Sequence, residues 1–295
     1  MGNYLTACSD VHTSDPNRFT YFETHAGDGL TVIEGEPIDG SPVIAANRGV
    51  NVVAMDIDLE NVKALKQRLK FHGDRAIVFK GDTCNPDDVE LLLSHVPAYY
   101  HSLGFLDPEG PGQLPFAVVQ RVLKHEYTYA DDSWTRRPEL LINFPLKRLK
   151  QNAGLLQPGA SEPGEESQDE SGELAEKLLE KNDAFFGGPD WREEWRRTAH
   201  DSVASRNALL AVYLRKVAPF YDFPPQHILV SSAQGAPLYY LIFFTTQSLG
   251  QKVFDSVRGA VENYQKERWV RENLKIKLSL EEYADEPGQT SLDEY

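Results

Sequence analysis

The chain has 295 residues, of which 41% are hydrophobic and 25% are charged, and its formal net charge is −15. This length and composition suit a soluble protein with one large α/β domain, or one domain with an insertion. No run of about 18 apolar residues predicts a membrane span, and no basic segment followed by an apolar one predicts a secretory signal. Two cysteines, Cys8 and Cys84, are too few for a disulfide framework or a multi-thiolate metal site. We therefore expect a cytoplasmic protein.

The negative charge is concentrated in two segments. Residues 151–183 carry nine acidic and two basic side chains, and residues 281–295 carry six acidic side chains and no basic one. These segments account for −7 and −6, which leaves −2 for the rest of the chain. Both are rich in Glu, Ser, Pro and Gly, and we expect 157–175 and the tail to be mobile. The nearly neutral remainder does not exclude a polyanionic partner.

Short apolar runs alternate with amphipathic segments, which is typical of β–α–β units. The expected strands span residues 19–24, 51–57, 76–82, 103–108 and 139–145. Apolar residues at helical spacing predict a helix from residue 59 to a stop at Gly73. The segments that begin at Pro86 and Pro115 are expected as further crossover helices.

The last two expected strands are 227–232 and 236–246, after a long helical region. Because the link between them is so short, they can only be antiparallel neighbours. Five crossover-linked strands and a terminal hairpin resemble the fold of class I S-adenosylmethionine (SAM)-dependent methyltransferases. The predicted fold is thus α/β and Rossmann-like, with a seven-stranded sheet, an antiparallel terminal hairpin, and a helical insertion between the fifth and sixth strands.

The loop after the first strand resembles the glycine-rich cofactor loop of that fold. It runs from Glu23 through His25, Ala26 and Gly27 to Gly29, with His25 where the family has its first glycine. Glycines here allow a tight turn and a close approach of ligand to backbone, although an ordinary strand-to-helix turn would also use them. A dinucleotide fingerprint fits less well, because the third glycine or alanine is missing. The resemblance implies that these five residues bind the cofactor, and His25 could instead pack beneath the loop.

Carboxylates end the next strands. Asp56 closes the second strand, where the resemblance implies contact with the ribose hydroxyls, and Asp82 closes the third, beside the adenine amino group. Both could instead cap the following helices, and Asp58 and Glu60 are expected to be caps only. Ligands of open α/β sheets bind outside the carboxyl ends of the strands, so the site residues should meet in one crevice.

The sequence LDPEG closes the fourth strand, where methyltransferases have their catalytic loop. Asp107 and Pro108 fit the acid and first proline of amino-methyltransferases, whereas Glu109 and Gly110 replace the second proline and the aromatic residue. Glu109 could act as a general base or point into solvent. Asn143 lies at the same edge one strand over, and it could equally form a strand-end turn. We expect catalytic residues among Asp107, Pro108, Glu109 and Asn143.

The order of several motifs resembles the three-Cys-motif partner protein (TcmP) family of methyltransferase-like proteins. The resembling pieces are AGDG, SPVIAANRG, MDIDLENVKALKQRLK, KGDTCNPD, GFLDPEG, LLINFP and PLYYLIFFTTQSLGQKVF, between about residues 20 and 254. The resemblance implies SAM as cofactor and, as a partner, a radical-SAM-type protein with three cysteines. It does not imply a substrate.

Basic and aromatic residues follow the fifth strand. Lys147, Arg148 and Lys150 could contact the phosphates of a nucleic acid or form a solvated helix face. Trp191 and Trp195, one helical turn apart and flanked by arginines, could stack on bases, although two such residues more often dock a helix on a core. The histidines have no paired metal-ligand spacing, so no metal site is predicted.

We divide the chain into a SAM-binding core, an insertion, a return to the core and a tail. The corresponding ranges are 1–150, 151–222, 223–280 and 281–295. One long helix is expected around residues 191–220 of the insertion. The first functional hypothesis is a SAM-dependent methyltransferase acting on nucleic acid. The alternative is a non-catalytic partner subunit of a three-Cys-motif protein, and a third is a binder of NAD or another nucleotide.

Overall fold

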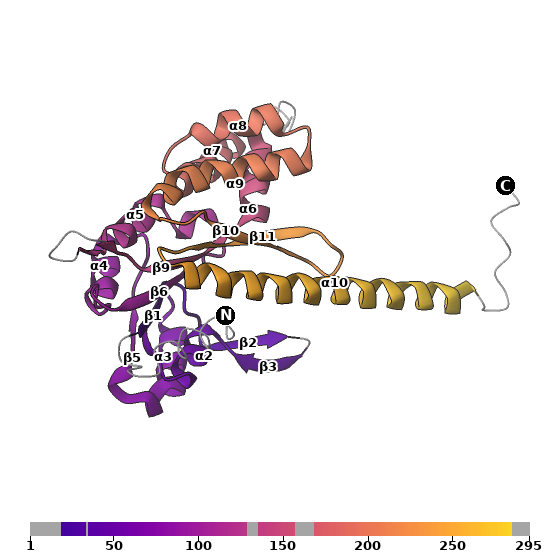
Figure 1. The fold of residues 1–295 in the computed structure, drawn as a ribbon. Coiled ribbons are helices and arrows are strands. Elements are labelled where there is room, and N and C mark those ends of the chain that lie inside the picture. The colour runs from indigo at the N-terminus through magenta and orange to yellow at the C-terminus, as the bar shows by residue number, and fades with distance from the viewer. Residues whose placement is uncertain (1–18, 34, 129–134, 157–167, 285–295) are drawn as a thin grey trace, which may run out of the picture.

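The computed structural model describes residues 19–33, 35–128, 135–156 and 168–284. Its centre is a seven-stranded sheet in the order β10-β11-β9-β6-β1-β4-β5 (Figure 1). The strands are β1 (Phe19–Glu23), β4 (Asn51–Asp56), β5 (Ala76–Lys80), β6 (His101–Leu106), β9 (Glu139–Phe144), β10 (Gln226–Ser231) and β11 (Pro237–Phe244). All seven lie where the sequence predicts strands.

Five of these strands are parallel and two form the terminal hairpin. β1 pairs in parallel with β4 and β6, β4 with β5, and β6 with β9. β11 is antiparallel to both β9 and β10 and lies between them in the sheet, although it is the last strand in the sequence. This arrangement confirms the predicted Rossmann-like class I methyltransferase fold.

Helices cover both faces of the sheet. One face packs against α2 (Ser41–Asn47), α3 (Leu59–Leu69) and the first part of α10 (Ser248–Ala284). The other packs against α4 (Pro86–Ser94), α5 (Phe116–Lys124) and α6 (Leu146–Ala153). Along β4, Val52 and Ala54 belong to the first core and Val53 and Met55 to the second. Such strands read as continuous apolar runs because a parallel sheet is buried on both sides.

The insertion adds a helical layer over α5 and α6. It consists of α7 (Gln168–Phe186), α8 (Asp190–Thr198) and α9 (Ser202–Val217) (Figure 1). The single long helix predicted around 191–220 is wrong: Asp201 caps a new helix by accepting hydrogen bonds from the backbone N–H groups of Val203 and Ala204. Trp191 and Trp195 are buried, as docking on a core requires, and are not available to stack on bases.

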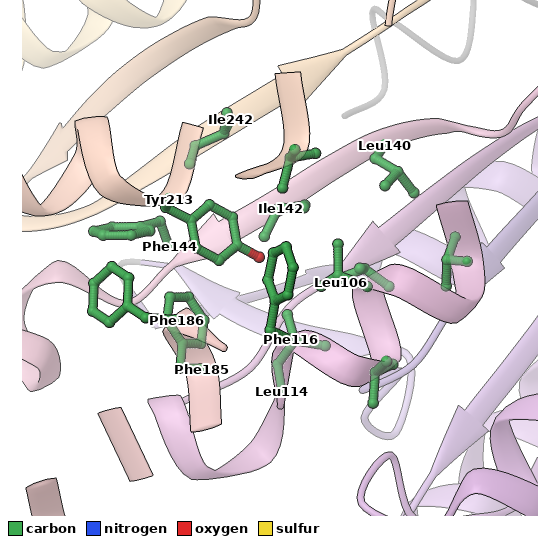
Figure 2. Packing of buried hydrophobic residues seen from close by; sticks show 14 of the residues in the cluster. Leu106, Leu114, Phe116, Leu140, Ile142, Phe144, Phe185, Phe186, Tyr213 and Ile242 are labelled. Carbon is green, nitrogen blue, oxygen red and sulfur yellow. The ribbon is translucent and has the colours of Figure 1, made fainter. Parts of the chain in front are cut away.

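An aromatic cluster joins the insertion to the sheet. Phe144 at the end of β9 makes edge contacts with Phe185, Phe186 and Tyr213, and Figure 2 shows these rings together with Phe116 of α5. Buried aromatic pairs of this kind contribute about 0.5–1.5 kcal/mol each beyond the area that they bury. The insertion is therefore fixed to the carboxyl end of the fifth parallel strand, next to the predicted catalytic loop.

Two strand pairs were not predicted. The hairpin of β2 (Leu30–Ile33) and β3 (Glu36–Asp39) lies between the glycine loop and α2, and β7 (Tyr127–Thr128) pairs with β8 (Thr135–Arg136). The first hairpin is closed at its base by the N–H of Gly40, which donates to the carbonyl of Gly29. β3 is exposed throughout, so no apolar alternation marked it in the sequence.

α10 follows the edge strand β10 and then extends beyond it (Figure 1). Gln265 fixes it there, because its side chain accepts from the N–H of Ser231 and donates to the carbonyl of Leu229. The helix continues to Ala284, so the first residues of the predicted tail are helical, and 285–295 lie outside the described residues. Along the described ranges, no helix has the length and apolar character needed to cross a membrane.

The predicted division at residues 150, 222 and 280 stays a prediction. α6 runs through its first boundary and α10 through its last. Of the segment 157–175 that we expected to be mobile, 157–167 lie outside the described residues, and α7 begins at Gln168.

Candidate cofactor cleft and catalytic loop

The carboxyl ends of β1, β4, β5 and β6 open into a cleft of about 480 Å³. This volume is within the usual range of small-molecule sites, about 300–1,000 Å³. The cleft is lined by Thr24, His25, Gly27, Asp56, Ile57, Asp58, Asn61, Gly81, Asp82, Thr83, Cys84, Asp107, Glu109, Gly112 and Gln113. Six predicted site residues are among them: His25, Gly27, Asp56, Asp82, Asp107 and Glu109. The other five, which are Glu23, Ala26, Gly29, Pro108 and Asn143, lie behind the lining.

The lining is strongly acidic. It contains five carboxylates, from Asp56, Asp58, Asp82, Asp107 and Glu109, and no lysine or arginine. Like charges in a partly enclosed cleft repel anions and attract cations. The cleft therefore suits a ligand with positive charge better than one that carries phosphates.

The glycine loop is tied to the neighbouring strand through Asp56. Its carboxylate accepts from the N–H of Gly27 at 2.8 Å, from the N–H of Asp58 at 2.8 Å and from the amide of Asn61 at 3.2 Å. A carboxylate has about four lone-pair sites, so roughly one remains for a ligand. Asp56 is only 7% exposed. Its hydrogen bonds hold the glycine loop in place, and its side chain also lines the cleft.

The two loop glycines differ in their surroundings. Both have positive φ, 61° at Gly27 and 79° at Gly29, a conformation that favours glycine. A Cβ at Gly27 would meet no atom within 4 Å, whereas one at Gly29 would lie 2.7 Å from Leu65 Cδ1 and 2.9 Å from Val43 Cγ2. Gly27 thus borders open space in the cleft, and Gly29 lets the chain pack tightly on α2 and α3.

Asp82 lies on the cleft and bonds to the turn that follows it. Its Oδ1 accepts from the N–H of Cys84 at 2.8 Å, while its own N–H donates to Asp88. The Cys84 thiol also interacts with this carboxylate. The alternative that Asp82 caps the following helix is wrong, because the N-cap of α4 is Asn85. Its carboxylate lines the cleft, where contact with a ligand stays a prediction.

His25 packs beneath the loops of the cleft and links three of them. Its Nδ1 lies 2.8 Å from Thr24 Oγ1, and its Nε2 lies 3.3 Å from the carbonyl of Gln113 and 3.4 Å from Thr83 Oγ1. Thr83 also donates to the carbonyl of Gln113. Burial lowers the pKa of His25 to about 4, so the ring is neutral at pH 7. Its Nε2–H can then donate to Gln113 while Nδ1 accepts from Thr24.

Glu23 is a buried strut between β1 and α2. It accepts from the hydroxyl of Tyr21 at 2.7 Å and from that of Ser41 at 2.8 Å, and it is 1% exposed. Burial raises the pKa of Glu23 to about 8, and the hydrogen bond from Tyr21 only partly offsets this. Ala26 is likewise structural: its N–H donates to the carbonyl of Met55.

Asp107, in the predicted catalytic loop after β6, lies beside Asn143 of the neighbouring strand β9. The Asn143 amide donates to Asp107 Oδ1 at 2.6 Å. Burial raises the pKa of Asp107, and the nearby charge of Glu109 raises it further, while the Asn143 hydrogen bond acts in the opposite direction. Asn143 Oδ1 is buried and has no hydrogen-bond partner among the described residues. Pro108 is buried beside this pair, and Glu109 is exposed, with its N–H bonded to Gln113 Oε1.

Sequence reasoning missed several lining residues. Thr83, Cys84 and Gln113 come from the loops after β5 and β6, and Ile57 and Asn61 follow Asp56. Asn61 is placed by the Asp58 cap, which starts α3 so that its first turn faces back to Asp56. Ile57 is 58% exposed on the cleft. An exposed isoleucine directly after a strand-end carboxylate is a signal that could have been used.

The three basic residues that follow the fifth strand do not form one group. Arg148 is exposed near the predicted catalytic loop, and Lys150 donates a hydrogen bond to Ser202. Lys147 is exposed and does not line the cleft. Among the described residues, no group of three or more His, Cys, Asp or Glu side chains has the arrangement of a metal site.

No family model and no curated protein matches this chain. Solved structures with similar folds include the cofactor-bound Rv0187 from MTB, at 12% identity and a TM-score of 0.40, over 84% of this chain and 80% of that one. An O-methyltransferase from Bacillus cereus in complex with SAH has 11% identity and a TM-score of 0.41, over 83% and 80%. A type I restriction-modification methyltransferase subunit from Streptococcus thermophilus has 10% identity and a TM-score of 0.38, over 84% and 44%. The strand order of the chain itself gives it the Rossmann-like class I methyltransferase fold.

Proposed function

We propose that this protein is a cytoplasmic SAM-dependent methyltransferase. One observation carries the proposal: a cleft at the carboxyl edge of a methyltransferase-type sheet, lined by five carboxylates and no basic side chain. SAM carries a sulfonium and an ammonium group against one carboxylate, so its net positive charge complements this lining. The pyrophosphate of NAD would be repelled by the same carboxylates, which disfavours the nicotinamide alternative.

The residues present fit SAM in three respects. The open space over Gly27 admits a ligand close to the backbone, and the remaining acceptor capacity of Asp56 suits one ribose hydroxyl. The Asp82 carboxylate, which lines the cleft, suits the adenine amino group. The apolar surface of Ile57 can pack against the adenine ring. Glu23, Ala26 and Gly29 support the cleft from behind, and His25 lines it while linking its loops.

SAM supplies a methyl group on a sulfonium that leaves as a neutral thioether, so the protein contributes mainly alignment and exclusion of water. Asp107, with its raised pKa, can accept the proton that the acceptor nitrogen or oxygen loses as its bond to the methyl carbon forms. Asn143 holds Asp107 in place from behind the lining. Glu109 lines the cleft beside Asp107.

We take nucleic acid as the acceptor class. Arg148, beside the catalytic loop, supports it, as does the acid-proline pair Asp107–Pro108. Glu109 and Gly110 replace the second proline and the aromatic residue of the base-methylating motif. We therefore propose no aromatic side chain at this position that would stack on the base.

Calorimetric titration with SAM, S-adenosylhomocysteine (SAH) and NAD tests the cofactor. We expect micromolar binding of SAM or SAH and none of NAD. Asp56→Ala should weaken SAH binding about tenfold or more, because a charged hydrogen bond and the order of the Gly27 turn are both lost. Asp28→Ala is the matched control, since Asp28 lies in the same loop but not on the cleft. NAD binding that exceeds SAH binding would overturn the proposal.

The second candidate function is a non-catalytic partner of a radical-SAM-type three-Cys-motif protein. It is favoured by His25, whose neutral ring occupies the place of the first loop glycine and joins the loops beneath the cleft. This reading predicts SAH binding without methyl transfer to RNA, DNA or protein when labelled SAM is supplied. Transfer to any of these pools that Asp107→Asn abolishes would exclude it.

A further inference from the structure

A second cavity, of about 420 Å³, lies on the other side of the catalytic loop. It shares Glu109, Gly112 and Gln113 with the acidic cleft, so one short segment separates the two spaces. α6 contributes Arg148 to its wall, and α7 contributes Lys181. The insertion therefore supplies part of the wall, Leu178 and Lys181, of a cavity that adjoins the cofactor cleft.

The two cations are held in place by a buried amide pair. The Asn152 amide donates to Asn182 Oδ1 at 2.9 Å, and the Asn182 amide donates to the carbonyl of Leu149 at 3.1 Å. Asn182 is fully buried and Asn152 is 9% exposed. These bonds fix the register of α6 against α7, and Arg148 and Lys181 lie next in sequence to Leu149 and Asn182.

Lys181 also packs directly on the catalytic loop. A Cβ on Gly112 would lie 3.1 Å from Cδ and 3.2 Å from Cγ of Lys181, so the lysine stem rests on bare backbone. Lysine stems pack in this way while the ammonium group stays in solvent. The ammonium of Lys181 is thereby brought to the rim of the cavity.

The charges of Arg148 and Lys181 are not neutralised by the protein. Neither side chain forms an ion pair within the described ranges, and Arg148 has only a 3.4 Å contact with the amide oxygen of Gln151. Other insertion cations do have acidic partners: Lys177 pairs with Glu173 and Lys216 with Asp190. Glu109 is the one carboxylate among the residues that line this cavity, so Arg148 and Lys181 leave it net positive and suited to an anionic group.

We propose that this second cavity binds one nucleotide of the methyl acceptor, with its phosphate held by Arg148 and Lys181. The assignment rests on the proposed function, because the nucleotide would reach the methyl donor across the wall of Glu109, Gly112 and Gln113. A volume of about 420 Å³ suits a single small-molecule unit rather than a duplex. The positive charge of this cavity favours an anionic acceptor, whereas the acidic cleft favours a cationic cofactor.

The test measures binding of 5′-CMP and of a short single-stranded oligonucleotide to the full chain saturated with SAH. SAH occupies the cofactor cleft, so neither probe can bind there. We expect Arg148→Ala with Lys181→Ala to weaken binding of the probe about tenfold or more. Lys177→Ala with Arg197→Ala removes the same charge from exposed positions outside both cavities and should change it less than about twofold. Arg148→Lys with Lys181→Arg, which retains the charges, should retain most of the affinity.

The two probes distinguish a free nucleotide from a nucleotide within a strand. Binding of CMP indicates a free nucleotide as acceptor, and binding of the oligonucleotide alone indicates a strand; either supports the site if the double alanine variant loses it. Equal weakening by both double variants would overturn the site and indicate nonspecific charge attraction, and so would no binding of either probe to the SAH-saturated protein. SAH affinity is read in the same titrations: its absence contradicts the proposed function, whereas intact SAH affinity with no probe binding contradicts only this inference.

Discussion

The two cavities that meet at the catalytic loop are organised in opposite ways. In the acidic cleft, buried carboxylates are bonded to the protein itself: Asp56 accepts three hydrogen bonds, and Glu23 joins Tyr21 to Ser41. In the second cavity, the charges of Arg148 and Lys181 are exposed and unpaired within the described chain. The acidic cleft is therefore preorganised by its own hydrogen bonds, whereas the positive charge of the second cavity can be neutralised by a ligand.

This difference separates what the fold requires from what recognition requires. Changes in the cleft should alter stability and cofactor affinity together, because the same bonds serve both. Changes in the second cavity should alter only acceptor binding.

The largest effect is expected at Asp107. Asp107→Asn keeps the shape of the side chain but removes its ability to take a proton, so kcat should fall about 10²–10⁴-fold. SAH affinity should change less than in Asp56→Ala, because the substitution keeps the size and shape of a side chain that lines the cleft. Once an acceptor is found, single-turnover transfer from labelled SAM measures this. Glu109→Gln is the control and should reduce kcat less than about tenfold; the reverse order would move the catalytic role to Glu109.

Substitution of alanine for each of the two loop glycines should destabilise the protein to different extents. Gly29→Ala places a Cβ 2.7 Å from Leu65 Cδ1 at a φ of 79°, so overpacking adds to backbone strain and about 2–5 kcal/mol of unfolding free energy should be lost. Gly27→Ala meets no neighbour within 4 Å and should cost only about 1–2 kcal/mol from its φ. Urea denaturation measures both. Equal losses would contradict the distinction between packing and open space.

Glu23 should make the protein less stable as pH rises. Its folded pKa of about 8 exceeds its ordinary value of 4.5, so the folded state holds the proton more tightly, and stability is lost between these two values. The loss should total about 5 kcal/mol. Glu23→Gln should flatten the decline measured by denaturation between pH 5 and 9, whereas Glu36→Gln, at an exposed carboxylate, should leave it in place.

His25 should act in the opposite direction. Its folded pKa of about 4 lies below its ordinary value of 6.5, so its contribution is complete above pH 6.5 and is lost as pH falls toward 4. The expected loss is about 2–3 kcal/mol. An NMR titration of the His25 ring should show a neutral imidazole throughout the neutral range. A ring that titrates near pH 6.5 would mean that it is not held between Thr24 and Gln113.

Most of the fold could be predicted because parallel strands are buried on both faces and read as continuous apolar runs, as in residues 51–56. The three- or four-residue link before the last strand fixed the hairpin. The hairpin β2–β3 could not be predicted, since every residue of β3 is exposed and β3 lacks apolar alternation. The helix break at residues 199–201 depends on one Asp cap, a local signal within a long helical pattern.

The site was predictable where a carboxylate ends a strand, because topology brings those ends together, as with Asp56, Asp82 and Asp107. Burial decided the rest. Glu23, Gly29 and Asn143 lie behind the lining because each is held by neighbours distant in sequence, and His25 lines the cleft but is tied to Gln113. Lys181 was missed altogether, since only the packing of α7 on Gly112 brings it to the catalytic loop.

Protection of Cys84 tests the central claim most directly. Cys84 is exposed on the cleft beside Asp82, so a bound adenosine group would cover its thiol. Alkylation of Cys84 by iodoacetamide, followed by peptide mass spectrometry, should slow markedly when SAH is added, and the Asp56→Ala variant should lose this protection. An unchanged alkylation rate at SAH concentrations that saturate the calorimetric titration would place the ligand elsewhere and contradict the account.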